Sequence, residues 1–267
     1  MIEPLHALIL GIVEGLTEYL PISSTGHLIV ASHWLGLHGE GVKTFEVVIQ
    51  AGAICAVLGL YRGRVMEMGR GLFGRDADGR RLFGNLVISF VPAMAAGLLL
   101  HDLIKERLFE IWPVAAALAA GGLLMIAGNG WLRRRADTGS DLASLDWTQA
   151  LLIGLAQCLA LWPGASRAML TMVAGMAIGL SPVAAAEYSF LLALPTLGAA
   201  TALDALHGGS ALLRDVGALS LLIGFVSAAV VAALAVRGLV RYVTRHGLAV
   251  FGWYRVALAA VIWWSLR

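Results

Sequence analysis

The sequence predicts an all-α polytopic membrane protein with six transmembrane helices plus two re-entrant helix pairs in an inverted-topology repeat. Three observations predict this class: an apolar composition, an uneven distribution of arginines, and an internal repeat. Of 267 residues, 59% are hydrophobic and 13% are charged, whereas soluble domains carry about a quarter charged residues. The net charge of +2 argues against a nucleic-acid-binding surface. The environment that this composition suits is a lipid bilayer.

Six segments are apolar and long enough, at roughly 17 to 22 residues, to cross a bilayer as helices. They are residues 45–61, 82–100, 111–132, 183–203, 216–236 and 247–266. Two further apolar stretches, 5–36 and 148–181, are interrupted near the middle by proline and small polar residues. These interruptions predict a break in each stretch rather than one continuous span.

Arginines give the predicted orientation. Twelve of them lie in loops 62–81, 133–147 and 237–246, whereas the opposing loops 37–44, 101–110 and 204–215 hold four basic residues. Because basic loops stay in the cytoplasm, the arginine-rich loops are predicted to be cytoplasmic. The stretch at 148–181 then starts and ends inside, and the stretch at 5–36 starts and ends outside. Each is therefore predicted to enter the membrane and return as a re-entrant helix pair.

The two interrupted stretches are similar in sequence. The segment ALILGIVEGL at 7–16 aligns with ALLIGLAQCL at 150–159, which places Glu14 on Gln157. Three predicted spans, an odd number, follow each copy, so the copies face opposite sides of the membrane. Such an inverted repeat brings its broken helices together near the midplane and forms the binding site there.

After one deletion, the alignment pairs Ser24 with Ser166. The chain then divides into two inverted repeats, about 1–135 and 142–267. Non-helical backbone within a bilayer is tolerated only where it lines a cavity inside the protein. We therefore predict that the two halves interlock as a single membrane domain, 1–267, with both breaks facing a shared cavity.

Two carboxylates interrupt the first apolar stretch. Glu14 and Glu18 are four residues apart, so on a helix they share one face. A charge at the centre of a bilayer costs at least about 2.5 kcal/mol, so a cation, a shared proton or a facing arginine must compensate them. The alternative is an amphipathic surface helix that keeps both carboxylates in water.

A short polar motif follows these carboxylates. Pro21 ends the first helix, and Ser23, Ser24 and Thr25 can cap the next one through their hydroxyls. A helix N-terminus with free N–H groups is an anion site. Simple capping is the alternative, but capping does not require His27 in the first turn of an otherwise apolar helix.

The second stretch carries a matching motif, Pro163-Gly-Ala-Ser-Arg-Ala-Met-Leu-Thr171. Here a serine, Ser166, begins the next helix and Arg167 lies deep in an apolar segment. An intramembrane arginine indicates a functional site, and its planar fork matches phosphate oxygens. Helix N-termini, hydroxyls and this arginine together predict a phosphate pocket. The carboxylates and His27 add the chemistry for metal binding and proton transfer.

These two motifs resemble those of the undecaprenyl-pyrophosphate phosphatase family, known for bacitracin resistance. The likeness extends to residues 45–54 and 188–195 and covers nearly the whole chain. It implies removal of the terminal phosphate from undecaprenyl pyrophosphate on the outer side of the bacterial inner membrane, which recycles the lipid carrier for cell-wall synthesis. The family usually continues its second motif as Ser-Arg-Ser-Gly, whereas this chain has Ala168 and Met169. We therefore expect a changed pocket floor.

The enzyme interpretation gives each motif residue a role. Ser24 is the candidate nucleophile and His27 handles its proton, with a metal-bound water as the alternative nucleophile. Arg167 grips the departing phosphoryl group. Glu14 and Glu18 hold Mg²⁺ or Ca²⁺ with waters, or one of them acts as the base. The predicted catalytic residues are Glu18, Ser24, His27 and Arg167, the substrate-binding residues Ser23, Thr25, Ser166 and Thr171, and the metal ligands Glu14 and Glu18.

Other aspects stay open at this point. Arg255 lies within the last predicted span, where it either pairs with Glu46 or Glu187 or reaches the phosphates. The expected partner is a polyprenyl pyrophosphate lipid in the membrane, and a homodimer is compatible with the sequence.

Inverted repeats are also the usual architecture of alternating-access carriers, so a flippase of a polyprenyl phosphate is the alternative function. A carrier needs charge complementarity but not a hydroxyl beside a proton acceptor, which favours the enzyme.

Overall fold

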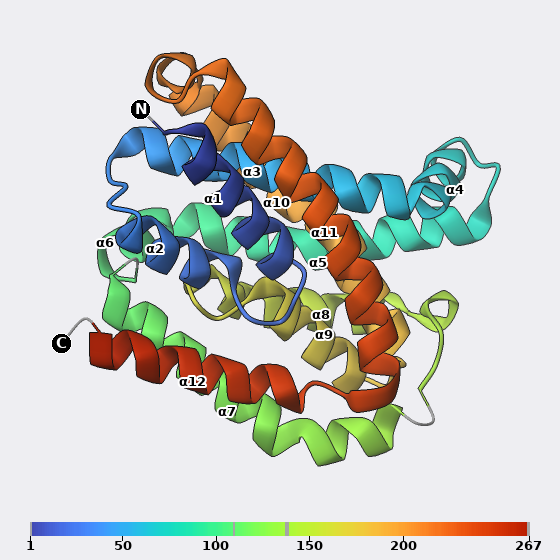
Figure 1. Cartoon of the computed structure of the whole chain (residues 1–267). Helices are drawn as coiled ribbons and strands as arrows, with labels where there is room; N and C mark the ends of the chain where they lie inside the picture. Colours follow the sequence, from blue (N-terminus) through green and yellow to red (C-terminus); the bar gives the residue numbers. More distant parts are fainter. Residues whose placement is uncertain (1, 109, 137–138, 266–267) are drawn as a thin grey trace.

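The protein is a bundle of helices (Figure 1). A computed structural model describes residues 2–108, 110–136 and 139–265. The helices are α1 Pro4–Thr17, α2 Ser24–Trp34, α3 Glu40–Leu60, α4 Arg62–Leu72, α5 Ala77–Leu99, α6 His101–Arg107, α7 Ile111–Ala136, α8 Trp147–Cys158, α9 Arg167–Ala177, α10 Pro182–Asp215, α11 Ala218–His246 and α12 Ala249–Ser265, with short 3₁₀ turns at Leu142–Ser144 and Leu159–Leu161.

Four helices in the described chain are long and apolar enough to cross a membrane: α5, α7, α10 and α11. They coincide with four of the six predicted spans. The predicted span 45–61 forms α3, which bends by 79° into α4, and the pair counts as a fifth candidate if taken as one span. The last predicted span forms α12, whose 17 residues extend only about 25 Å at 1.5 Å per residue. The protein is thus a multi-pass membrane protein, and the complete set of six spans stays a prediction.

Both interrupted stretches fold as two short helices around a break. The first stretch forms α1 and α2, and the second forms α8 and α9 with a 3₁₀ turn after α8. These helices have 11 to 14 residues, which is fewer than the roughly 20 needed to cross a bilayer. Within each stretch the two helices pack against each other.

The main packing contacts join the two halves of the chain. Helix α1 packs against α11, as α8 packs against α5, and α3 packs against both α10 and α11. Helices α7 and α12 lie side by side along one edge of the bundle (Figure 1). Because each interrupted stretch packs on a long helix of the other half, the structure interlocks the halves around the two breaks.

Close packing of α1 on α11 depends on glycine. A Cβ added at Gly15 would lie 2.5 Å from the carbonyl oxygen of Ala228 and 2.9 Å from the amide nitrogen of Ala232. Gly11, one turn earlier, is equally close to the backbone of Gly224. Small residues at four-residue spacing allow helix backbones to approach closely in membrane proteins. This spacing fixes the position of α1, which carries Glu14 and leads into Glu18.

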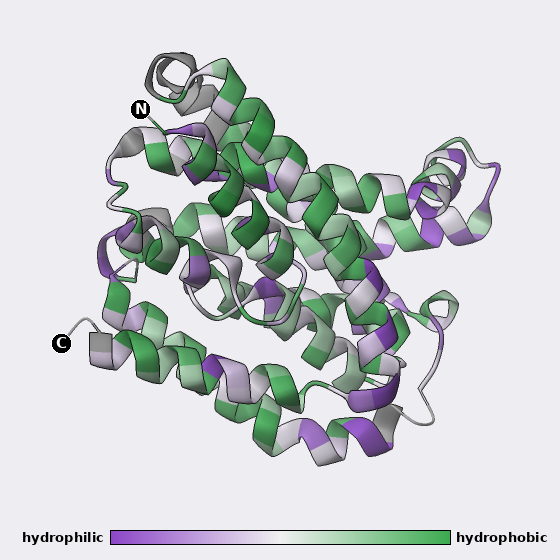
Figure 2. Cartoon of the chain, in the orientation of Figure 1, coloured by the Kyte–Doolittle hydropathy of each residue, from purple (hydrophilic) through white to green (hydrophobic). Residues whose placement is uncertain are grey.

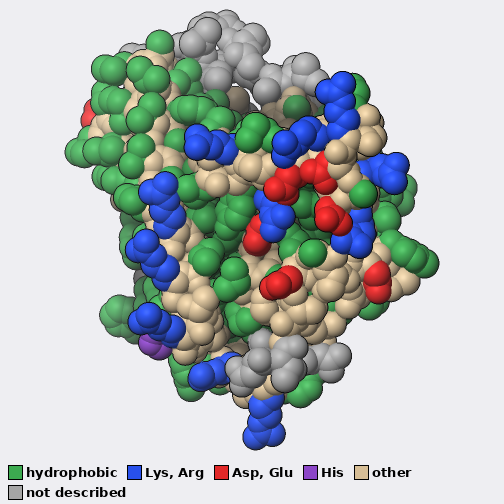
Figure 3. Space-filling view, turned by 90° about the vertical axis from the view of Figure 1, so that its right-hand side faces the viewer, with side chains coloured by type: hydrophobic (Ala, Val, Ile, Leu, Met, Phe, Trp, Pro, Cys, Tyr) green, Lys and Arg blue, Asp and Glu red, His purple; other side chains and the backbone are tan. Residues whose placement is uncertain are grey.

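Charged residues gather at one end of the molecule. Hydrophilic segments around α4 and at the C-terminal ends of α7 and α11 lie toward the right of Figure 2, while most of the bundle is hydrophobic. Viewed from that end, lysine and arginine side chains are spread across the face, with acidic side chains among them (Figure 3). Two ion pairs join Arg64 of α4 to Glu187 at 2.7 Å and to Glu67 at 3.1 Å.

Candidate active site

Two serines in an unusual backbone conformation begin the helices that follow the breaks. Ser23 precedes α2 with φ 74° and ψ 98°, and Ser166 precedes α9 with φ 71° and ψ 108°. They are the non-glycine residues of positive φ in the described chain, a conformation that is strained for residues with a side chain. Each side chain accepts a hydrogen bond from an amide three residues later, Gly26 at 3.4 Å and Met169 at 3.2 Å.

This match corrects one detail of the internal alignment. The sequence alignment with a deletion pairs Ser24 with Ser166, but the shared conformation and capping pair Ser23 with Ser166. The offset of 143 residues therefore continues through the break. The structural counterpart of Ser24 is then Arg167. The residues directly after the two caps therefore carry the hydroxyl and the guanidinium that are predicted to be catalytic.

Glu18 links these two residues. Its Oε2 accepts a short hydrogen bond from the Ser24 hydroxyl, and its Oε1 accepts one from Arg167 Nη2 at 2.7 Å. Glu18 is 7% exposed and Ser24 is 9% exposed. The prediction that the first-motif acid faces the second-motif arginine is therefore confirmed, and the alternative of a surface helix with both acids in water is wrong.

Arg167 is held from several sides. Its Nη1 donates to the Ser189 carbonyl at 3.0 Å and approaches the Ser189 hydroxyl at 3.4 Å, and its guanidinium lies 5.7 Å from the centre of the Tyr19 ring. Thr171 contacts the Arg167 carbonyl at 2.8 Å and the Ser189 hydroxyl at 2.7 Å, so it braces this arrangement. Arg167 Nε is buried and has no hydrogen-bond partner in the described structure. A buried donor of this kind is costly unless a ligand satisfies it.

Glu14 lies one helical turn from Glu18 and is 1% exposed. Its charged neighbours are Glu18, Glu46 and Arg167. Its Oε1 is buried without a hydrogen-bond partner in the described structure, which is an unfavourable position for a carboxylate oxygen. Two oxygen-donating carboxylates fit a hard divalent cation, because Mg²⁺ commonly binds one or two carboxylates together with waters and substrate phosphates. Among the described residues, no group of three or more acidic, histidine or cysteine side chains is arranged so that it could hold a metal ion by itself.

In the described structure His27 makes no hydrogen bond to Ser24, and its predicted role in proton transfer stays a prediction. Its Nδ1 lies 2.7 Å from the carbonyl oxygen of Ser23, and its Nε2 lies 2.7 Å from the Tyr254 hydroxyl. The His27 and Tyr254 rings are parallel, with centroids 5.6 Å apart. Since a carbonyl only accepts, Nδ1 carries the proton. The Ser24 hydroxyl instead donates its hydrogen bond to Glu18.

Arg255 forms neither of the predicted ion pairs, with Glu46 or with Glu187, and its predicted reach to the phosphates stays a prediction. Its guanidinium is completely buried and donates to backbone carbonyls rather than to a carboxylate. Glu187 instead pairs with Arg64, and Glu46 accepts from the Ser32 hydroxyl at 3.2 Å. The sequence could not reveal this arrangement because the acceptors are main-chain atoms.

The departures from the second family motif lie in the core. Ala168 and Met169 are each 1% exposed and belong to the main hydrophobic cluster. Their side chains therefore fill the bundle behind Arg167. Thr25 is partly buried and stands at the N-terminus of α2 beside Ser24, where its predicted substrate contact stays a prediction.

Three residues of the site were not predicted: Tyr19, Ser189 and Tyr254. Each is a hydroxyl-bearing residue within an apolar run, and Ser189 also lies in the family-like segment 188–195; these are the sequence signals that could have identified them. Tyr19 is fully buried, and its hydroxyl donates to the Ala53 carbonyl at 2.9 Å.

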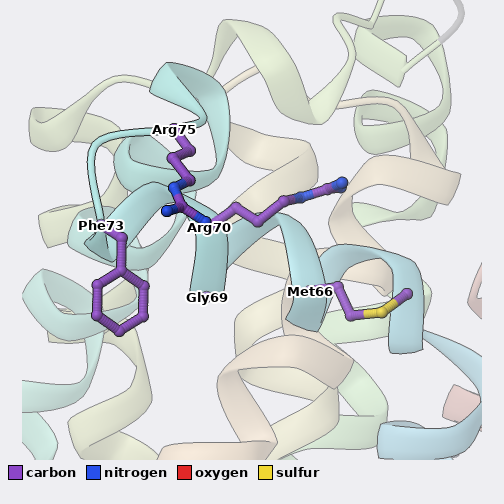
Figure 4. A pocket seen from close by; sticks show the side chains of 5 residues that line it. All are labelled: Met66, Gly69, Arg70, Phe73 and Arg75. Carbon is purple, nitrogen blue, oxygen red and sulfur yellow. The ribbon is translucent and has the colours of Figure 1, made fainter.

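One surface cavity lies away from these residues. It is lined by Met66, Gly69, Arg70, Phe73 and Arg75, around the end of α4 (Figure 4). Helix α4 packs on α3 and α5, not on the two breaks. The candidate site is defined instead by the contacts of buried polar groups.

Comparisons with known proteins show which family the chain belongs to. A family model described as "Bacitracin resistance protein BacA" matches residues 7–261. The chain belongs to this family. It is 50% identical to an undecaprenyl-diphosphatase of Sorangium cellulosum over 97% of this chain and 85% of that protein. Undecaprenyl-diphosphatases of Acinetobacter baumannii, at 44% over 97% and 94% of the two chains, and of Ectopseudomonas mendocina, at 45% over 96% and 92%, are similar. The sequence-based assignment to this family is confirmed.

Proposed function

We propose that the protein is an integral membrane phosphatase that hydrolyses undecaprenyl pyrophosphate to undecaprenyl phosphate and inorganic phosphate. The observation that carries this proposal is the Ser24–Glu18–Arg167 contact chain in a member of this family. The names of its relatives give the reaction. These contacts bring together in one buried site the Ser24 hydroxyl, an adjacent base in Glu18, and the Arg167 guanidinium, whose shape matches phosphate.

The substrate headgroup binds between the two helix N-termini. In the described structure, the first amides of α2, Ser24 and Thr25, and of α9, Arg167 and Ala168, have no hydrogen-bond acceptor. Free amides at a helix start favour phosphate oxygens. The unpaired Arg167 Nε adds a charged donor. Ser23 and Ser166 hold both helix starts in place through their capping bonds.

The chemical step begins at Ser24. Its Oγ attacks the terminal phosphorus, its proton passes to Glu18 Oε2, and the bond from that phosphorus to the bridging oxygen breaks. Undecaprenyl phosphate leaves, and water then hydrolyses the phosphoserine ester to release inorganic phosphate. Arg167 stabilises the charge that accumulates on the transferred group. His27, bonded to the Ser23 carbonyl and Tyr254, keeps the α2 start in position.

A divalent cation, Mg²⁺ or Ca²⁺, completes the proposal. Glu14 and Glu18 would hold it, and the unpaired Glu14 Oε1 provides a free ligand atom. When bound, the cation neutralises phosphate charge and polarises the group under attack. The protein groups Glu18 and Arg167 keep the roles described above.

The site opens toward the outer leaflet of the bacterial inner membrane in this proposal. In Figure 1, α1 starts and α2 ends on the side opposite α4, as a re-entrant pair from the outside requires. The contact pattern, with α1 on α11 and α8 on α5, supports an inverted repeat of about 1–135 and 142–267, with six spans and two re-entrant pairs in one domain. The polyprenyl tail stays in lipid while the headgroup enters. All named residues come from one chain, and a homodimer is compatible with this arrangement.

The test is phosphate release from purified protein in detergent with undecaprenyl pyrophosphate and Mg²⁺. A flippase would release no phosphate, because a carrier moves its lipid without breaking a covalent bond. A detergent micelle also offers no second compartment into which the lipid could be moved. Acid-quenched enzyme should carry phosphate on the Ser24 peptide. Normal turnover without any phosphopeptide would instead favour attack by a metal-bound water.

A further inference from the structure

Arg255 of α12 is a buried cation whose partners are main-chain atoms. The residue is 0% exposed, and its described hydrogen bonds all run to carbonyl oxygens. They run to Leu118 at 3.3 Å, Pro21 at 3.4 Å, Ala117 at 3.1 Å, Gly164 at 2.9 Å and Ala165 at 3.1 Å. A buried charge without a carboxylate is expensive, so this arrangement calls for a functional reason.

The positions of these carbonyl oxygens in the fold indicate the function of Arg255. Pro21 lies two residues before the Ser23 cap, and Gly164 and Ala165 lie directly before the Ser166 cap. The Arg255 guanidinium therefore donates hydrogen bonds to the backbone of both helix breaks, although the breaks are more than 140 residues apart in sequence. Ala117 and Leu118 belong to α7 and fix the guanidinium to a long helix. Five N–H donors in a rigid plane allow one arginine to do this.

Helix α7 is shaped to admit this side chain. A Cβ added at Gly121 would collide with Arg255 Nη2 and would lie 2.9 Å from its Cζ. Any other residue at position 121 would thus occupy the guanidinium's place. Gly130, nine residues further along the same helix, has nothing within 4 Å of an added Cβ and is exposed.

We propose that Arg255 is a positioning residue that clamps the Ser23 and Ser166 turns to each other. By holding the carbonyls of both turns on its own side, it leaves the amides that begin α2 and α9 directed at a shared phosphate site. It also offsets the strain of two positive-φ serines. Arg255 acts through these turns and does not touch the reacting atoms.

The first test measures the turns without any substrate. Amide hydrogen exchange reports local opening, so peptides covering residues 20–27 and 163–170 are followed in the full-length protein. In Arg255→Lys, which keeps the charge but loses the planar fork, both turns should exchange at least about tenfold faster while α11 stays protected. Gly121→Ala should give the same pattern, and Gly130→Ala should match the parent. Faster exchange in only one turn, or equally in every helix, would overturn the clamp.

The second test is kinetic and rests on the proposed phosphatase activity. Misplacement of binding groups by about 1 Å costs on the order of 100-fold in rate. Arg255→Lys and Gly121→Ala should lower kcat by about that factor while KM changes only a few-fold, with Gly130→Ala unchanged. Arg255→Met, which fills the space without donors, should resemble Arg255→Lys; parent-like turnover in Arg255→Met would overturn the proposal. If the parent released no phosphate, the proposed function would fail while the exchange experiment still decided the clamp.

Discussion

At the scale of single residues, Arg167 and Glu18 form the contact on which the site depends. The two side chains are 8% and 6% exposed and 2.7 Å apart. At this depth each charge is stabilised chiefly by the other, so removing one partner leaves the other buried and uncompensated. This coupling explains why two charges are tolerated within an apolar bundle.

Arg167→Lys should lose most of the activity although the charge is kept. An ammonium cannot bridge Glu18 and the Ser189 carbonyl while presenting a third donor to phosphate, and we expect kcat/KM to fall about 100-fold or more. Phosphate release measures this directly. Arg81→Lys is the control, because Arg81 is half exposed and pairs with Asp78 outside the site. Activity close to that of the parent would refute the phosphate-gripping role.

The two acids should respond differently to neutralisation. Glu18 touches both Ser24 and Arg167, so Glu18→Gln should harm turnover more than Glu14→Gln does. Glu14→Gln should mainly raise the Mg²⁺ concentration needed for half-maximal activity, because its Oε1 is the unpaired atom. A metal titration of both variants tests the ranking; an unchanged metal response in Glu14→Gln would contradict it.

Groups that act as one unit give non-additive losses. Glu18→Gln combined with Arg167→Ala should therefore be little worse than the worse single variant. The comparison of kcat/KM across the four proteins is a double-mutant cycle. Losses that multiply would mean that the two residues act independently despite their contact.

At the scale of helices, the position of Glu18 depends on how closely α1 packs against α11. The sequence contains the signal for this contact, Gly11-x-x-x-Gly15, but a glycine pair alone does not name its partner helix. The partner is α11, which presents Gly224 and Ala228 to it. The predicted break at Pro21 and the serine caps followed from local chemistry, whereas this packing is a property of the tertiary structure.

Gly15→Ala should lower both stability and turnover. The added methyl would lie 2.5 Å from the Ala228 carbonyl, and overpacking of this kind typically costs about 1–3 kcal/mol. Moving α1 outward would also move Glu18 from Arg167. Thermal unfolding in detergent and phosphate release test both effects. Gly59→Ala, where an added Cβ meets nothing within 4 Å, should behave as the parent; equal losses in both variants would rule out the packing argument.

How far the sequence could predict the site depends on the type of contact involved. Glu18, Ser24 and Arg167 stood out because charged and hydroxyl groups are costly in an apolar segment. The partner of His27 did not, because Tyr254 is 227 residues away and looks like an interfacial aromatic residue. Arg255 was recognised as unusual, but its carbonyl partners carry no side-chain signature. The charged and hydroxyl residues of the two motifs were therefore predictable, including the long-range pairing of Glu18 with Arg167, whereas contacts to main-chain atoms and to Tyr254 were not.

At the scale of the whole molecule, orientation in the membrane is the prediction that decides between arrangements. The arginine-rich segments lie toward one end (Figures 2 and 3), and the loop between α2 and α3 lies at the other (Figure 1). If basic loops face the cytoplasm, the α1–α2 pair enters from outside and the α8–α9 pair from inside. The two breaks then meet within the membrane, where Arg167 can reach Glu18.

Single cysteines test this orientation in a background without Cys55, which is exposed, and Cys158, which is partly buried. His38→Cys, in the α2–α3 loop, should react with a membrane-impermeant maleimide in intact cells. Arg75→Cys, beyond α4, should react only after the membrane is opened, and both should react equally in detergent. Both native residues are exposed, so burial cannot explain a difference between them. Labelling of position 75 from outside would place the re-entrant pairs on the wrong sides, and the outward-facing phosphate site would have to be abandoned.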